Sequence, residues 1–201
     1  MEKNKILKRK KIPKHNIIFE GAELAGKSYL MSQVYDYLEP KYNSGAKIMD
    51  GCHWFNCDVG IFGTRFGQKT ILKYLELLED INDSNVMIEK FHLTEAVYQK
   101  LYNKQDFDFS KIEDRLFNIK AKIILLIFDE DEKLLQKRLE DRLKIYPHYS
   151  RIAQTPADYI KQQQLYLKLI KQSKLDYLII NSSKLPNPSL VNKVLEFLRE
   201  K

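Results

Sequence analysis

The sequence is poor in cysteine and glycine and lacks any long apolar run, and each shortage excludes a class of protein. Its two cysteines, Cys52 and Cys57, do not make a disulfide framework, and no second pair completes a four-ligand metal site. Seven glycines in 201 residues exclude a collagen-like chain. The longest strongly apolar stretch, Ile123 to Phe128, is far shorter than the ~20 residues that cross a bilayer. The N-terminus has no apolar run of the signal-peptide type, so we expect a cytoplasmic protein with no membrane partner.

Positive charge is concentrated at the beginning of the chain. The 34 Lys and Arg residues against 27 Asp and Glu give a net charge of +7, and 44% of the residues are hydrophobic, which is typical of a globular protein. Seven basic residues and one acid fall within residues 1–14, so this segment carries +6 and the rest of the chain +1. We expect a basic N-terminal tail over 1–14 and one domain over 15–201. The tail is either solvated or an arm that makes weak contact with nucleic acid.

Short apolar runs alternate with longer segments of helical period. The predicted strands are Asn16–Glu20, Ala46–Asp50, Asn85–Glu89, Lys122–Phe128 and Asp176–Asn181. The predicted helices are Lys27–Leu38, Gln68–Ile81, Leu93–Tyr102, Asp131–Lys144, Ala157–Gln172 and Ser189–Arg199. Runs that are apolar without alternation indicate strands buried on both faces. The pattern predicts an α/β three-layer sandwich in which helices cover both faces of a five-stranded parallel sheet.

One motif carries the chemistry. After the first predicted strand the chain reads Gly21-Ala22-Glu23-Leu24-Ala25-Gly26-Lys27-Ser28, and Tyr29 continues into a predicted helix. This matches the phosphate-binding loop (P-loop), in which glycines let backbone N–H groups and the helix N-terminus face a triphosphate. Lys27 would neutralise charge on the β- and γ-phosphates, and the Ser28 hydroxyl would bind Mg²⁺. The motif predicts a P-loop NTPase-type fold that binds ATP or GTP with Mg²⁺.

From this loop onward the chain resembles the thymidylate kinase and deoxynucleoside kinase group of P-loop kinases. The segment Glu89–Gln99 resembles the one that follows the third strand of thymidylate kinases. The helix with Arg138 and Arg142 resembles the helix that leads to an arginine-bearing lid over ATP. Tyr159–Ile170 and the strand ending Ile180–Ser183 resemble the last helix and the adenine-side loop. The resemblance implies a kinase that uses ATP and Mg²⁺, has a lid at about residues 138–155 and forms a homodimer.

The resemblance also implies roles for individual residues. Glu89 stands at the acid near the acceptor and the metal, and Tyr98 and Gln99 stand where thymidylate kinases hold the base; Tyr98 is equally well explained as a core aromatic. Lys90 replaces an arginine that grips the acceptor phosphate, and an ammonium cannot make the same bidentate fork.

The resemblance implies that lid arginines help to neutralise the charge of the transferred phosphoryl group, and Arg138, Arg142 and Arg151 are the available lid cations. Because Leu24 stands where some family members carry an arginine, the lid must supply that charge. We expect Arg142 and Arg151 to be catalytic and Arg138 to lie on the ATP side.

The chain departs from thymidylate kinases after the second predicted strand. It has Asp50, Trp54 and Phe55 in a stretch where thymidylate kinases have Arg-Glu-Pro-Gly, and this looks more like deoxynucleoside kinases. Asp50 would then be a general base toward a sugar hydroxyl, and Trp54 and Phe55 would wall the base pocket. Arg65 is the alternative phosphate grip for an acceptor that already carries a phosphate.

The sequence therefore predicts ATP-dependent phosphoryl transfer to a deoxynucleoside monophosphate. Three alternatives stay open: a deoxynucleoside kinase acting on the sugar 5′-hydroxyl, a kinase acting on DNA or another polynucleotide through the basic tail, and a non-catalytic nucleotide-binding protein.

Overall fold

A computed structural model describes residues 14–57 and 60–200, which fold around a five-stranded parallel sheet. The strand order is β2-β3-β1-β4-β5 and every pair is parallel, which confirms the predicted five-stranded parallel sheet. The strands are β1 (Asn16–Glu20), β2 (Cys52–Asn56), β3 (Asn85–Glu89), β4 (Lys122–Ile127) and β5 (Tyr177–Asn181). Strands β2 and β3, which come next in the chain, lie on one side of β1, and β4 and β5 lie on the other side. This reversal opens a crevice at the carboxyl ends of the strands, where ligands bind in such sheets.

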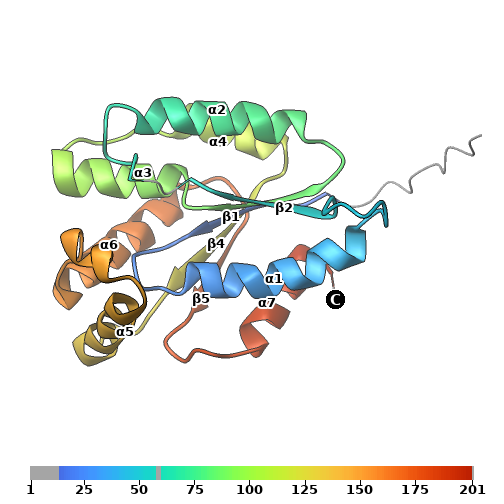
Figure 1. Ribbon diagram of the computed structural model, residues 1–201. Helices are drawn as coiled ribbons and strands as arrows, with labels where there is room; N and C mark the ends of the chain where they lie inside the picture. Colours follow the sequence, from blue (N-terminus) through green and yellow to red (C-terminus); the bar gives the residue numbers. More distant parts are fainter. Residues whose placement is uncertain (1–13, 58–59, 201) are drawn as a thin grey trace, which may run out of the picture.

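Helices cover both faces of the sheet (Figure 1). They are α1 (Lys27–Tyr42), α2 (Gly67–Asp80), α3 (His92–Tyr98), α4 (Ser110–Asn118), α5 (Glu132–Ile145), α6 (Pro156–Leu169) and α7 (Ser189–Leu198). Shorter helical turns occur at Gln99–Asn103, Pro147–Arg151 and Ile170–Gln172. In Figure 1, α1 and α7 lie below the sheet and α2, α3 and α4 above it, while α5 and α6 lie at the end toward which β1 points. Among the residues that the structure describes, no helix has the length and apolarity needed to cross a membrane.

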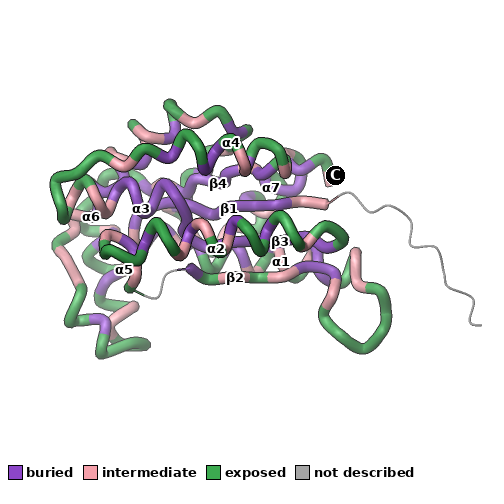
Figure 2. Tube along the Cα trace, turned by 90° about the horizontal axis from the view of Figure 1, so that it is seen from above, coloured by how far each residue is buried: buried purple, intermediate pink, exposed green. Residues whose placement is uncertain are grey.

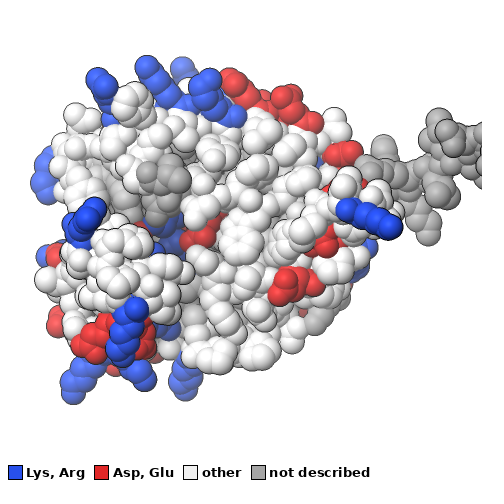
Figure 3. Space-filling view, in the orientation of Figure 1, with Lys and Arg blue, Asp and Glu red and all other residues white. Residues whose placement is uncertain are grey.

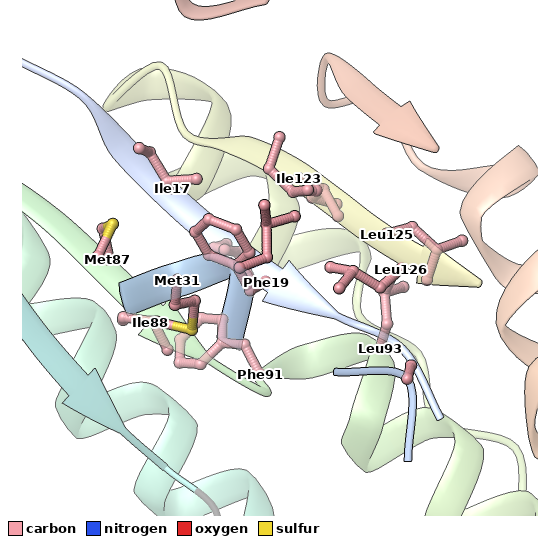
Figure 4. Close-up of a cluster of buried hydrophobic side chains, with 14 of the residues drawn as sticks. Ile17, Phe19, Met31, Met87, Ile88, Phe91, Leu93, Ile123, Leu125 and Leu126 are labelled. Carbon is pink, nitrogen blue, oxygen red and sulfur yellow. The ribbon is translucent and has the colours of Figure 1, made fainter. Parts of the chain in front are cut away.

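The core is built on the central strands. All five residues of β1 and all five of β3 are buried, as Figure 2 shows along β1. Side chains from β1, β3 and β4 pack with Met31 of α1 and with Phe91 and Leu93 at the start of α3 (Figure 4). Residues buried on both faces explain why these strands read as unbroken apolar runs in the sequence. The central strands therefore form a rigid base for the loops at their carboxyl ends.

Three elements differ from the sequence-based prediction. The second strand is Cys52–Asn56, so the prediction of a strand at Ala46–Asp50 was wrong. Because β2 is an edge strand with alternating burial, its short pattern is weaker than that of the central strands. Helix α4 was not predicted, although its buried residues Ile112 and Leu116 lie at helical spacing. The helix expected over Leu93–Tyr102 changes at Gln99 from α- to π-helical hydrogen bonding.

Candidate active site

The loop between β1 and α1 has the backbone shape that its glycines allow. Gly21 has φ +140°, and a Cβ there would lie 2.4 Å from the carbonyl oxygen of Leu126 on β4, so only glycine fits. Gly26, with φ +76°, precedes α1, and no side chain caps this helix end. The N–H groups of the first turn therefore face the loop without a side-chain acceptor, as an anion-binding helix N-terminus requires.

Lys27 lies across this loop. Its Nζ donates hydrogen bonds to the carbonyl oxygens of Gly21, at 2.9 Å, and Ala22, at 2.8 Å, and its side chain is buried. These bonds place the ammonium inside the curve of the loop. The position suits neutralisation of a bound phosphate chain.

Ser28 and Glu89 form the next part of the site. The Ser28 hydroxyl lies 2.9 Å and 3.0 Å from the two carboxylate oxygens of Glu89, which ends β3 beside β1. Mg²⁺ prefers such oxygen ligands and usually completes its shell with water and substrate phosphates. Among the described residues no group of three or more His, Cys, Asp or Glu could hold a metal. Ser28 and Glu89 could contribute oxygen ligands to a Mg²⁺ ion that also binds nucleotide phosphates.

Glu23 is the centre of a charged cluster on the other side of the loop. Its carboxylate forms an ion pair with Lys90, accepts a hydrogen bond from the Tyr98 hydroxyl at 3.2 Å, and lies 4.0 Å from the Arg142 guanidinium. Burial by itself would raise the pKa of Glu23, but Lys90, Lys27 and Arg142 outweigh that effect and lower it to about 2. The loop carboxylate is therefore charged at neutral pH and holds Lys90 in place.

The cluster opens into a cavity of about 640 Å³. The cavity lies between the loop, the end of α3 and the segment that joins α5 to α6. Its walls are largely aromatic and its charges are mostly basic; the lining residues include Glu23, Phe62, Tyr98, Arg142, Tyr149 and Arg151. Arg142 lies over the Tyr149 ring at 4.3 Å, and its buried Nε has no hydrogen-bond partner among the described residues. An aromatic wall beside the guanidinium groups of Arg142 and Arg151 suits a ring-bearing ligand with an anionic group.

Arg138 holds the opposite edge of the loop. Its guanidinium donates to the carbonyl oxygens of Leu24, at 3.0 Å, Ser182, at 2.5 Å, and Ser183, at 3.1 Å. The Ser182 hydroxyl also donates to the Ala25 carbonyl oxygen at 2.7 Å. Burial lowers the pKa of Arg138, although a guanidinium remains charged. The residue thus joins α5 and the loop after β5 to the backbone of the phosphate loop.

Several residues that the sequence singled out lie elsewhere. Asp50 precedes β2, at the amino end of the sheet, where its carboxylate accepts the Ser44 N–H at 2.8 Å. A base for transfer at the carboxyl ends cannot act from there, and the misplaced strand is the reason for the error. Arg65 is exposed and lies over the Phe66 ring at 4.7 Å. Neither residue lines the cavity, so neither identifies the acceptor.

Trp54 and Phe55, the predicted walls of the base pocket, do not line one pocket together. Adjacent residues of a strand point to opposite faces. Trp54 faces Tyr35 of α1 and lines a second, open groove of about 570 Å³ with Ser28 and Glu89, whereas Phe55 packs on Tyr74 of α2.

The two residues predicted to contact the base, Tyr98 and Gln99, differ in position: the first lines the cavity and the second does not. Gln99 donates to Glu95 at 2.8 Å and accepts from Asn103 at 2.7 Å, so its amide is used within the helix.

Tyr29, which follows the phosphate-loop motif in the sequence, is exposed at the start of α1.

Residues that the sequence reasoning missed come from α6 and the segment before it. Tyr159, Gln162, Gln163 and Tyr166 are the buried residues of α6. Gln162 accepts the Glu23 N–H at 3.3 Å, and Gln163 bonds both backbone groups of Phe128. The available signal was a run of adjacent glutamines between the tyrosines of an otherwise amphipathic helical segment.

Comparisons with known proteins bear on the fold. No family model and no curated protein matches the sequence. Among solved structures, the chain is similar to the YorR protein of Bacillus subtilis in complex with phosphorylated GDP (TM-score 0.64, 17% identity, 91% of this chain and 95% of that one). It is also similar to deoxyadenosine kinase of M. mycoides with dCMP and dCDP bound (TM-score 0.54, 14% identity, 92% and 98%). Thymidylate kinase of Ehrlichia chaffeensis gives a TM-score of 0.54 at 13% identity over 93% and 100%. At these identities the likeness establishes a P-loop kinase-like fold.

Proposed function

We propose that this protein is a P-loop kinase that transfers the γ-phosphoryl group of ATP to a nucleoside monophosphate. One arrangement carries the proposal: the phosphate loop with Lys27 and the Ser28–Glu89 pair adjoins an aromatic cavity whose cations are Arg142 and Arg151. The structural similarity to nucleotide and nucleoside kinases supports the same reaction class.

The donor side needs the loop, Lys27 and a metal. Backbone N–H groups of Gly21–Ser28 bind the phosphate chain, and Lys27 exchanges its loop carbonyls for phosphate oxygens. Ser28 and Glu89 would hold Mg²⁺, which supplies charge neutralisation on the transferred group when it is bound. Arg138 holds the phosphate loop against Ser182–Ser183, the segment that we expect to lie beside the adenine.

The acceptor side needs cations that line the cavity and can bind a phosphate. Lys90 is paired with Glu23, so it is a weaker phosphate grip than the family arginine it replaces. Arg142 and Arg151 reach the cavity from the segment that we propose as a lid, residues 138–155. Their charges favour an acceptor that already carries a phosphate. A neutral nucleoside would instead need a base near the 5′-hydroxyl, and Asp50 lies too far from the cavity to be that base.

The described chain begins at the sheet edge opposite the site. Lys14 donates to the carbonyl oxygens of Leu78, at 3.2 Å, and Ile81, at the end of α2, and β1 runs from there toward the phosphate loop. The basic residues before Lys14 lie outside the described residues. The visible face in Figure 3 carries its described acidic and basic side chains in small groups. On this face the described basic side chains form no continuous stripe, which agrees with a free nucleotide as the acceptor.

A panel assay tests the proposal. The protein is incubated with ATP, Mg²⁺ and each of the common nucleosides and nucleoside monophosphates, and the products are separated, with Lys27→Met as the blank. We expect diphosphates from one or more monophosphates. Products from nucleosides alone would favour the deoxynucleoside kinase alternative, and no product with any acceptor would favour a non-catalytic nucleotide-binding protein.

A further inference from the structure

Glu20, the last residue of β1, is a fully buried carboxylate immediately before the phosphate loop. One carboxylate oxygen accepts the backbone N–H groups of Phe91, at 3.0 Å, Leu93, at 3.0 Å, and Thr94, at 3.4 Å. The other oxygen accepts the Thr94 hydroxyl at 2.5 Å. All four donors belong to the turn after β3 and the first residues of α3. The end of β1 is therefore hydrogen-bonded to the start of α3.

These bonds replace a cap that α3 does not have. Phe91 stands at the N-cap of α3 and its side chain makes no capping bond, so the N–H groups of the first turn need another acceptor. Glu20 supplies it from a different strand. Burial raises the pKa of Glu20, and the hydrogen bonds from Thr94 and Leu93 act in the opposite direction by stabilising the carboxylate.

The segment held in this way carries two residues of the site. Glu89 ends β3, and Lys90 follows with φ +61°, a left-handed conformation that is unfavourable for a residue with a side chain. Lys90 N–H donates to the Phe19 carbonyl oxygen at 2.9 Å, and Phe91 N–H donates to Glu20. The backbone of Lys90 is therefore held by hydrogen bonds from Lys90 and Phe91 to the end of β1. Such bonds are needed to keep a residue in an unfavourable backbone conformation.

The Thr94 hydroxyl continues the network into α6. It lies 2.8 Å from the Tyr166 hydroxyl, and both side chains are buried. Since Thr94 has one hydroxyl proton and gives it to Glu20, Tyr166 is the donor in the second bond. The same carboxylate thus links β1, α3 and α6 around the back of the phosphate loop.

We infer that Glu20 is a positioning residue: it fixes the turn that presents Glu89 to Ser28 and Lys90 to Glu23, and so sets the affinity of the nucleotide site for Mg²⁺. This inference rests on the proposed function of the site. Removing the acceptor would release the turn and let Glu89 move away from Ser28, while the loop residues themselves stay unchanged.

The test uses Glu20→Met, which keeps the size of the side chain and removes both acceptors, and Glu20→Gln, which keeps one oxygen for the N–H groups. The matched control is Glu200→Met. Glu200 is a similarly buried carboxylate that accepts from His15, Lys41 and Tyr42 at the opposite edge of the sheet. Binding of a fluorescent ATP analogue is titrated with Mg²⁺ for each full-length protein, well below its unfolding temperature, and kcat is measured in parallel.

We expect Glu20→Met to raise the Mg²⁺ midpoint by about tenfold and to lower kcat, Glu20→Gln to recover most of both, and Glu200→Met to lose stability only. If Glu20→Met does not fold, Thr94→Val, which removes the hydroxyl donor alone, should raise the midpoint by a smaller factor. A Mg²⁺ midpoint in the folded Glu20 or Thr94 variant equal to that of Glu200→Met would overturn the inference while leaving the proposed function intact. A wild-type protein that binds no nucleotide would overturn both.

Discussion

Arg142 gives the sharpest test of the site, because its structural contacts are weak and its proposed catalytic role is large. Its guanidinium lies over the Tyr149 ring at 4.3 Å and 4.0 Å from the Glu23 carboxylate, and its side chain is 41% exposed. A cation–π contact of this kind contributes about 0.5–1 kcal/mol. A partly exposed ion pair contributes about 0–1 kcal/mol. Arg142→Ala should therefore cost at most about 2 kcal/mol of folding free energy, a fall of about 4–8 °C in Tm for a chain of this size.

The catalytic loss should be larger. A preorganised donor that meets charge developing in the transition state typically contributes about 10²- to 10³-fold in kcat. Arg142 lines the cavity beside the phosphate loop, so we expect its guanidinium to be such a donor. Because the phosphate loop and Lys27 bind ATP without it, the KM for ATP should change by less than about threefold.

The assay is steady-state ADP formation at 25 °C with saturating acceptor, combined with a thermal unfolding curve for each variant. Lys144→Ala is the control, since this exposed residue of the same helix pairs only with the nearby Asp141 among the contacts described. Its kcat should match wild type. If Arg142→Ala turns over at the wild-type rate, Arg142 has no part in the mechanism; if it loses activity only through ATP affinity, it is a binding residue.

Three further predictions follow from the same structure. Gly21→Ala should abolish nucleotide binding and lower the free energy of unfolding by about 1–3 kcal/mol, because the new Cβ would lie 2.4 Å from the Leu126 carbonyl oxygen. Urea unfolding and the thermal shift caused by ATP measure these two effects. The control is Gly45→Ala, where φ is +78° but nothing lies within 4 Å of the added Cβ. Glu23→Gln should cost most stability at neutral pH: the folded pKa of about 2 lies below the ordinary 4.5, so the stabilisation is complete above pH 4.5 and is lost toward pH 2. A difference between wild type and this variant that grows on acidification would contradict that sign. Deleting residues 1–13 should leave turnover of free nucleotides unchanged, and loss of that turnover would show that the tail serves the site.

The central strands and the phosphate loop could be predicted because their signals are local. Asn16–Glu20 and Asn85–Glu89 have the bounds that the sequence predicted, because each centres on three consecutive apolar residues that are buried. The loop motif depends on spacing within eight residues. The edge strand β2 was misplaced because one face of it is half exposed, and its position is decided by pairing with β3.

The sequence by itself determined the fold class and the position of the phosphate loop, because a strand, a glycine-rich turn and a helix start need only neighbouring residues. The tertiary structure decided which charges meet. Lys90 reaches Glu23 across 67 positions, Glu20 reaches Phe91 across 71, and Arg138 reaches Leu24 across 114. Such pairs depend on which strands lie side by side and which way each side chain leaves the sheet. The same dependence removed Asp50 and Phe55 from the site and brought Tyr149 and Gln162 into it.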